Sequence, residues 1–329
     1  MKNKYIFFLQ RFWRDLTNPL GFKIPDDLSS KKLTYYYFLF YEDEIVNQKG
    51  GTKSFILDEN GIPMNTTYVD VKDQNFVYFP ITIGQYGLAV FHTYLQTKSE
   101  KDKRRFMNIV DWFYEHRITD HKLGVYWLTD VPLPQYKNPG PWQSAFVQGR
   151  ALSVFLRAYQ LTGEQKFLDT ALDALKIFKF PVKDDGVTSF TKWGPMYEEY
   201  TASVPTLVIN GHIFSLFGLY DCVRACPNSQ LAHQLFYDGI KTVENALPDY
   251  DLGFWSRYNL CQADFHSDID PATVTYHRLH ISQLKVLSRL VESPTILSYI
   301  EKWKRYDNLF NIFRMYILKY KSLRKIGRL

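Results

Sequence analysis

Hydrophobic and polar residues follow two different patterns along the chain, and the change falls near residue 80. After it, apolar residues recur every three or four positions, the spacing that places them on one face of an α-helix. The pattern predicts helices near residues 82–97, 101–116, 144–161, 164–178, 205–225, 229–247, 277–291 and 295–306. Such a succession of helices indicates a mainly α fold.

The predicted helices form a repeating unit. Three long apolar helices close on Tyr94, Tyr159 and Tyr220, and each is followed by a second, amphipathic helix. A repeated helical hairpin has to bury its apolar face against its neighbours. This predicts an α/α toroid, an incomplete barrel of helical hairpins, over residues 81–306. A helical-repeat interaction scaffold would show the same periodicity, so the chemistry of the loops has to separate the two.

The two ends of the chain differ from this central part. Residues 1–80 predict a small appendage with a helix near residues 4–16 and a β-hairpin, whose strands at 54–57 and 67–71 flank the Asn60-Gly61 turn. Residues 307–329 predict a basic amphipathic helix. Aromatic and basic residues are mixed at both ends, which is typical of segments that lie on an anionic membrane face. Helices that pack on the domain and expose a charged face would show the same mixture.

Composition and charge favour an acidic glycan as partner. Aromatic residues make up 17% of the chain, and sugar rings stack on flat apolar faces, although most aromatics fill the core. The net charge of +6 favours a polyanion. We expect no nucleic acid partner, because the sequence has no zinc-finger spacing, RNA-binding aromatic motif or phosphate-binding loop.

The cysteines and the apolar runs bear on the compartment. Cys222, Cys226 and Cys261 are odd in number and lack a paired metal spacing, which favours a reducing environment. No apolar run reaches the ~20 residues of a membrane-spanning helix, and no leader cleavage site is visible. We therefore expect a cytoplasmic protein, with peripheral contact at the inner membrane face and a homodimer both left open.

Candidate chemistry gathers in three polar-aromatic segments, residues 197–200, 256–260 and 275–280, which lie before or between predicted helices. A toroid presents its active face at such loops. The alternative is that the glutamates are solvated turn residues and the tyrosines tether the loops.

Metal and cofactor signals are weak. His277 and His280 lack the further ligands of a zinc site. Asp264, Asp268 and Asp270 lack the Gly and terminal Glu of a calcium loop, so structural calcium is only an alternative. No dinucleotide fingerprint is present. We expect no cofactor and no catalytic metal.

Several segments resemble the D-glucuronyl C5-epimerase family. Residues 197–221, YEEYTASVPTLVINGHIFSLFGLYD, are similar to its signature, in which a Glu-Glu-Tyr element leads through Pro to an Asn-Gly helix. Residues 276–287 resemble the family's Tyr-His-x-x-His-Ile-x-Gln-Leu segment, and Tyr258 falls at its second tyrosine position. Residues 80–88 and 142–149 also match family blocks.

The resemblance covers roughly residues 78–305 and belongs to the C-terminal catalytic domain of heparosan and heparan epimerases. It implies that Glu199, Tyr200, Tyr258 and Tyr276 line the reacting sugar. The substrate-binding residues expected beside them are Asn210, Gln148, Arg150, Arg257, His277, His280 and Trp142.

The chemistry of C5 inversion explains these residue types. A proton beside a carboxylate is weakly acidic, so the site needs a base within hydrogen-bond reach and a proton donor on the opposite face of the sugar. We expect Glu199 and Tyr276 to form this pair, with Tyr200 and Tyr258 orienting it or donating hydrogen bonds to the enolate. The expected activity converts D-glucuronate to L-iduronate in an acidic polysaccharide or lipid-linked glycan. A polysaccharide lyase and a non-catalytic glycan-binding protein are the alternatives.

Two positions depart from the family pattern. Cys261 replaces an Arg that would bind the substrate carboxylate, and Arg257, Arg150 or His280 would have to substitute for it. Phe214 stands where the family tends to have Tyr. Both changes concern the identity of the uronic acid more than the reaction.

Overall fold

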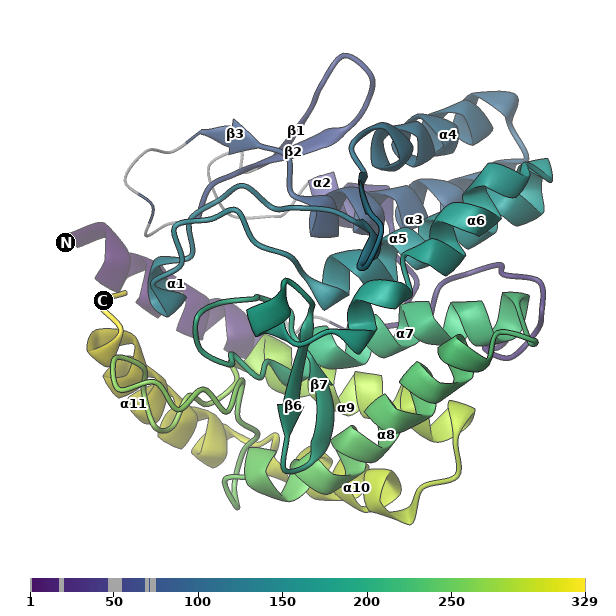
Figure 1. The fold of residues 1–329 in the computed structure, drawn as a ribbon. Helices are drawn as coiled ribbons and strands as arrows, with labels where there is room; N and C mark the ends of the chain where they lie inside the picture. Colours follow the sequence, from purple (N-terminus) through teal and green to yellow (C-terminus); the bar gives the residue numbers. More distant parts are fainter. Residues whose placement is uncertain (1, 18–20, 47–54, 69–70, 72–74, 329) are drawn as a thin grey trace.

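The computed structural model describes residues 2–17, 21–46, 55–68, 71 and 75–328. Within this part the chain is mainly helical, and its central helices form hairpins arranged along an arc (Figure 1). Each hairpin joins an inner helix to an outer one: α3 (Pro80–Thr97) with α4 (Glu100–Glu115), α5 (Ala145–Thr162) with α6 (Gln165–Asp173), α7 (Ile209–Ala225) with α8 (Gln230–Tyr250), and α9 (Val274–Leu290) with α10 (Pro294–Tyr306).

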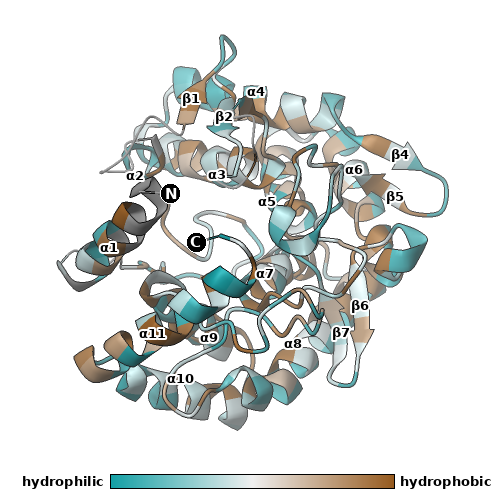
Figure 2. Ribbon diagram, turned by 90° about the vertical axis from the view of Figure 1, so that its left-hand side faces the viewer, coloured by the Kyte–Doolittle hydropathy of each residue, from teal (hydrophilic) through white to brown (hydrophobic). Residues whose placement is uncertain are grey.

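The inner helices also contact one another in chain order, α3 with α5, α5 with α7 and α7 with α9, so the hairpins follow an open ring (Figure 2). The predicted incomplete α/α toroid is therefore confirmed. Burial distinguishes the two layers. The inner helices α5 and α7 are buried on nearly every face, whereas the outer helices α4 and α8 bury one stripe. Gly149 and Gly218 bring α5 and α7 close: a Cβ on Gly218 would lie 2.2 Å from the carbonyl oxygen of Gly149.

The remaining elements are short, apart from the terminal helices. They are α1 (Lys2–Thr17), α2 (Glu42–Val46), β1 (Phe55–Leu57), β2 (Pro63–Thr66), β3 (Phe76–Val77), β4 (Ile118–Asp120), β5 (Gly124–Tyr126), β6 (Thr188–Thr191), β7 (Gly194–Tyr197) and α11 (Leu309–Lys325). β1, β2 and β3 form one antiparallel sheet, and β4–β5 and β6–β7 form two hairpins. Across the described residues, each helix is too short or too polar to cross a bilayer.

Three predicted boundaries were wrong. The second hairpin strand lies at Pro63–Thr66 and not at 67–71. The turn before it is tight because the Asp58 carboxylate accepts hydrogen bonds from the backbone N–H groups of Asn60 and Ile62. Residues 69–70 of the predicted strand lie outside the described part. The helix predicted over 164–178 ends at Asp173 and gives way to a 3₁₀ turn at Lys176–Lys179.

The third boundary concerns α7. It begins at Ile209 and not near residue 205, because the backbone N–H groups of Thr206 and Leu207 are bound by a carboxylate and Leu207 has a φ of 52°.

The segment before α3 packs against the C-terminal halves of all four inner helices. The backbone N–H of Tyr36 donates to His92 of α3, and Arg157 of α5 donates to the carbonyl oxygen of Thr34. The Tyr37 hydroxyl donates to Asp221 of α7 over 2.9 Å, and Arg289 of α9 donates to the carbonyl oxygen of Pro25. This segment contributes Leu28, Leu33, Tyr36, Tyr37 and Phe38 to the main core, so it closes one end of the ring. The domain boundary at residue 80 remains a prediction.

Candidate functional site

The predicted catalytic residues converge at the other end of the ring, where the inner helices begin. Glu199 and Tyr200 lie in the loop that precedes α7, and Tyr258 lies in the loop between α8 and α9. Tyr276 is in the first turn of α9, where its backbone N–H is bound by the side chain of Thr273. An isolated β-bridge between Val208 and Asn259 joins the first two loops.

Glu198 anchors the first loop from inside. Its side chain is buried and accepts hydrogen bonds from the Ser189 hydroxyl (2.6 Å), the Thr206 hydroxyl (2.6 Å) and the backbone N–H groups of Thr206 and Leu207. Four donors around one carboxylate fix the loop and delay the start of α7. The alternative of a solvated turn residue is therefore wrong for Glu198.

Glu199 is a buried carboxylate with a raised pKa. It is 4% exposed, and its Oε2 accepts a hydrogen bond of 3.0 Å from Asn210 Nδ2. Burial raises the pKa of Glu199 to about 7, although hydrogen bonds from Tyr200 and Asn210 act in the opposite direction. Gly211 provides the space, since a Cβ there would lie 2.3 Å from the Glu199 Cβ. Near neutral pH, Glu199 can therefore both accept and release a proton.

Three phenols surround this carboxylate. Tyr200 hydrogen bonds to Glu199 and also to Tyr258. The rings of Tyr258 and Tyr276 meet edge to face with centroids 5.0 Å apart. Burial raises the pKa of Tyr200 and Tyr258 well above 10, so both phenols are neutral donors at physiological pH.

Two further tyrosines belong to the cluster and were not predicted from sequence. Tyr136 is buried with its ring centroid 5.8 Å from that of Tyr200, and it stacks on His266. Tyr68 hydrogen bonds to Tyr200. Both come from segments without a helical pattern, so only the fold brings them to the site. Trp142, which was predicted, meets the ring of Tyr200 at 5.4 Å.

Cys261 brings no charge to this cluster. It is 4% exposed and packs with Tyr136, Trp142 and Tyr200, and burial raises the pKa of its thiol. A cation instead arrives from α11: Lys319 Nζ lies 5.6 Å from the ring centroid of Tyr258 and 2.6 Å from Asp270. Sequence patterns placed Lys319 in the terminal basic helix and gave no sign of this contact.

Arg150 lies deeper in the ring. It is fully buried, and its guanidinium carbon is 4.6–5.2 Å from the ring centroids of Tyr36, Phe40, Phe146 and Phe214. Among the described residues, none of its three guanidinium nitrogens has a hydrogen-bond partner. Aromatic faces are therefore its main attractive contacts.

Three other predicted binding residues make internal contacts instead. Gln148 donates to the carbonyl oxygens of Val125 and Ala174. His277 stacks on Trp255 and bonds to Ser256 and Trp303, and His280 also bonds to Ser256. Burial lowers the pKa of His277 to about 4 and that of His280 to about 3, so both are neutral at physiological pH.

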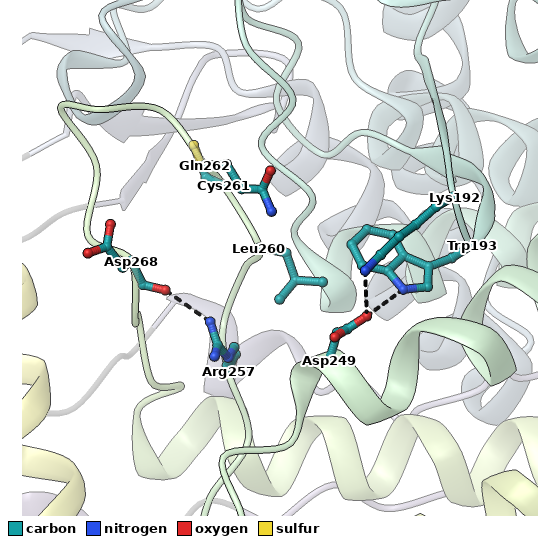
Figure 3. A pocket seen from close by; sticks show the side chains of 8 residues that line it. All are labelled: Lys192, Trp193, Asp249, Arg257, Leu260, Cys261, Gln262 and Asp268. Carbon is teal, nitrogen blue, oxygen red and sulfur yellow. Dashed lines mark hydrogen bonds and ion pairs between the residues drawn. The ribbon is translucent and has the colours of Figure 1, made fainter.

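Arg257 faces a neighbouring pocket. It donates to the carbonyl oxygen of Asp268, and the pocket of about 330 Å³ that it lines also includes Cys261, Asp249 and Trp193 (Figure 3). Asp249 there accepts from the Trp193 indole. Within the described part of the chain, no group of three or more His, Cys, Asp or Glu side chains is arranged to hold a metal ion.

Comparison with known proteins identifies the class. The arc of helical hairpins places the chain among the α/α toroids, and a buried carboxylate and phenols lie at its open end. More closely, the chain is a member of the family described as D-glucuronyl C5-epimerase C-terminus, whose model matches residues 120–305.

Individual relatives are distant. A D-glucuronyl C5-epimerase of Caenorhabditis elegans is 26% identical over 253 residues, which are 71% of this chain and 41% of that protein. The chain therefore spans about two fifths of its length. An uncharacterized protein of Methanocaldococcus jannaschii is 24% identical over 286 residues, 81% of this chain and 90% of that one. Among solved structures, the cellobiose 2-epimerase of Spirochaeta thermophila is similar with a TM-score of 0.46 and 14% identity, over 68% of this chain and 57% of that one.

Proposed function

We propose that this protein is a uronosyl C5-epimerase that converts D-glucuronate to L-iduronate residues within an acidic glycan. The observation that carries the proposal is Glu199, a buried carboxylate whose pKa is raised to about 7 and which is hydrogen bonded to Asn210 and Tyr200. Family membership supports it.

In the proposed reaction, ionised Glu199 removes the proton from C5. The electron pair of the broken C–H bond moves into the adjacent carboxylate group as an enolate, and the Tyr276 hydroxyl then gives a proton to the opposite face of C5. Tyr200 bonds to both Glu199 and Tyr258, and Tyr258 contacts Tyr276. The two faces are thus connected by phenols. The reverse reaction uses the same groups with acid and base exchanged.

No oxidation occurs in this scheme, so the proposal includes no nicotinamide and no metal. The substrate carboxylate needs a cation in place of the Arg that Cys261 replaces. We assign this role to Lys319, because it is the cation that α11 places over the face of Tyr258. The basic charge of the whole chain fits a polyanionic glycan, either a free polysaccharide or one linked to a lipid.

The experiment incubates the purified protein with each epimer of the glycan in deuterium oxide and measures C5 labelling by NMR. Wild type should label and invert both epimers. Tyr276→Phe and Glu199→Gln should each lose net inversion, yet each should still exchange the C5 proton of the one epimer that its remaining base deprotonates. Tyr237→Phe, which removes the hydroxyl of a half-exposed tyrosine on α8, is the matched control and should keep full activity.

Three results would contradict the proposal. Full inversion by either folded variant would remove that residue from the mechanism. Unsaturated oligosaccharides from wild type would indicate a lyase, because elimination starts with the same proton abstraction. Binding of the glycan without any labelling would indicate a non-catalytic glycan-binding protein.

A further inference from the structure

Helices α1 and α11 pair with each other and leave a large apolar surface exposed. The Tyr316 hydroxyl of α11 donates to Asp15 of α1 over 2.7 Å, and the rings of Phe12 and Tyr316 meet edge to face at 4.8 Å. The outward-facing residues are 45–75% exposed: Ile6, Leu9, Trp13, Leu309, Phe310, Phe313 and Ile317. Figure 2 shows hydrophobic residues along both helices at the edge of the ring. We call this surface the α1/α11 face.

A groove of about 500 Å³ runs along this face. Leu9 and Phe12 line it from α1, and Phe313 and Ile317 line it from α11. Its remaining lining residues, further along α11, include Lys321 and Arg324, both exposed. An apolar groove that ends in two cations fits a molecule with an apolar chain and an anionic head.

The charges of the two helices also fit a partner with an anionic head. The basic side chains that are exposed on the pair are Arg14 of α1 and Arg314, Lys321, Arg324 and Lys325 of α11. The single acidic residue of the two sequences, Asp15, is 4% exposed and bound by Tyr316. The exposed surface of the pair is therefore apolar and cationic.

We propose that the α1/α11 face docks on an anionic lipid bilayer, with its apolar side chains in the interface and its basic residues at the headgroups. Two aromatic-rich amphipathic helices with basic residues and no exposed acid are what such a surface binds. Neither helix qualifies as a membrane span, which agrees with a position in the plane of the interface. The inference is independent of the proposed epimerase activity.

Docking would place the bilayer beside the candidate site. On the inner side of α11, Lys319 and Ser322 both donate to Asp270, whose carbonyl oxygen accepts the backbone N–H of Tyr258. One helix thus carries the lipid-facing residues and supports the loop of the phenol cluster.

The test is co-sedimentation of the full chain with vesicles of phosphatidylcholine alone and with added phosphatidylglycerol. Wild type should bind the anionic vesicles, and binding should weaken as salt is raised. The double variant Phe313→Glu/Ile317→Glu should lower the partition coefficient at least tenfold. Lys321→Gln and Arg324→Gln should each lower it about fivefold, and only on anionic vesicles.

Phe190→Glu is the matched control, because Phe190 is 64% exposed on the β6–β7 hairpin, away from this face. It should bind vesicles like wild type, and circular dichroism should show the same fold for all variants. Equal binding by wild type and the Phe313→Glu/Ile317→Glu variant would overturn the proposal. A dimer in size-exclusion chromatography that this variant loses, together with no vesicle binding by wild type, would assign the face to a second copy of the chain and also overturn it.

Discussion

Asn210 donates a hydrogen bond of 3.0 Å from its Nδ2 to the Oε2 of Glu199. The bond joins the first turn of α7 to the loop before it, so the start of a core helix controls the ionisation of a loop carboxylate. Its direction favours the charged form of Glu199, whereas burial disfavours that form. The pKa of about 7 reflects the dominance of burial.

Replacing this donor should move the pH profile. In Asn210→Asp the hydrogen bond to ionised Glu199 is lost and a like charge is added, so the pKa of Glu199 should rise. We expect the acidic limb of kcat/KM for C5 exchange to shift upward from about pH 7 by at least about one unit. Asn245→Asp, on the exposed side of α8, is the control and should keep the wild-type limb. A limb that stays in place in Asn210→Asp would show that Glu199 does not govern it.

Glu199 should also make stability depend on pH. Between the ordinary carboxyl pKa and about 7, the folded protein holds a proton that the unfolded chain has released, so the free energy of unfolding falls as pH rises through this window. The fall should be about 3–4 kcal/mol. Glu199→Gln should remove it, which makes the variant more stable than wild type at pH 8 and similar at pH 4. Chemical denaturation at both pH values measures the difference, and an unchanged slope in Glu199→Gln would contradict the raised pKa.

Replacing Glu198 by Gln should destabilise the protein, in contrast to the same replacement at Glu199. In Glu198→Gln an amide N–H₂ replaces an oxygen that accepts from Ser189, Thr206 or Leu207, so donors face donors. We expect the free energy of unfolding to fall by about 2–4 kcal/mol. C5 exchange should fall with it, because the loop positions Glu199. The control is Glu301→Gln, an exposed carboxylate on α10, which should change stability by less than about 1 kcal/mol. Equal melting temperatures for the two variants would show that the four bonds around Glu198 add little.

Arg150 offers a test of a buried charge without hydrogen-bond partners among the described residues. An apolar side chain of similar length removes the desolvation cost and loses only the contacts with four aromatic rings. Arg150→Met should therefore keep or raise the melting temperature. The sequence-based role of Arg150, binding the substrate carboxylate, is tested in the same protein by KM. A higher KM at unchanged stability would support that role, and a strongly lowered melting temperature would contradict the prediction.

The helical architecture was predictable because its signals are local. The apolar periodicity predicted every helix of the four hairpins, and in α5 and α7 the apolar residues are not confined to one stripe, as is typical of inner helices. The start of α7 was missed because Glu198, eight residues before Thr206, binds the backbone N–H groups that would have begun the helix. That competition depends on a buried side chain and leaves no periodic trace.

The candidate site was predictable only in part for the same reason. Glu199, Tyr200, Tyr258 and Tyr276 stand in segments that resemble a family, and the structure brings them together. The contributions of Tyr68, Tyr136 and Lys319 depend on chain segments that meet only in three dimensions. Conversely, His277 stands in the same resembling segment as Tyr276 but points into the packing against Trp255 and Trp303.

The segment that closes the ring is synthesised well before several of the residues it packs against. Residues 25–38 leave the ribosome before two of their partners, Arg224 and Arg289, which are about 190 and 260 residues further along the chain. At ordinary rates of translation the delay is on the order of tens of seconds. During this time Tyr36, Tyr37 and Phe38, which are fully buried in the folded protein, lack much of their core. A nascent chain therefore exposes a run of aromatic side chains to chaperones and to other nascent chains until its last hairpin emerges.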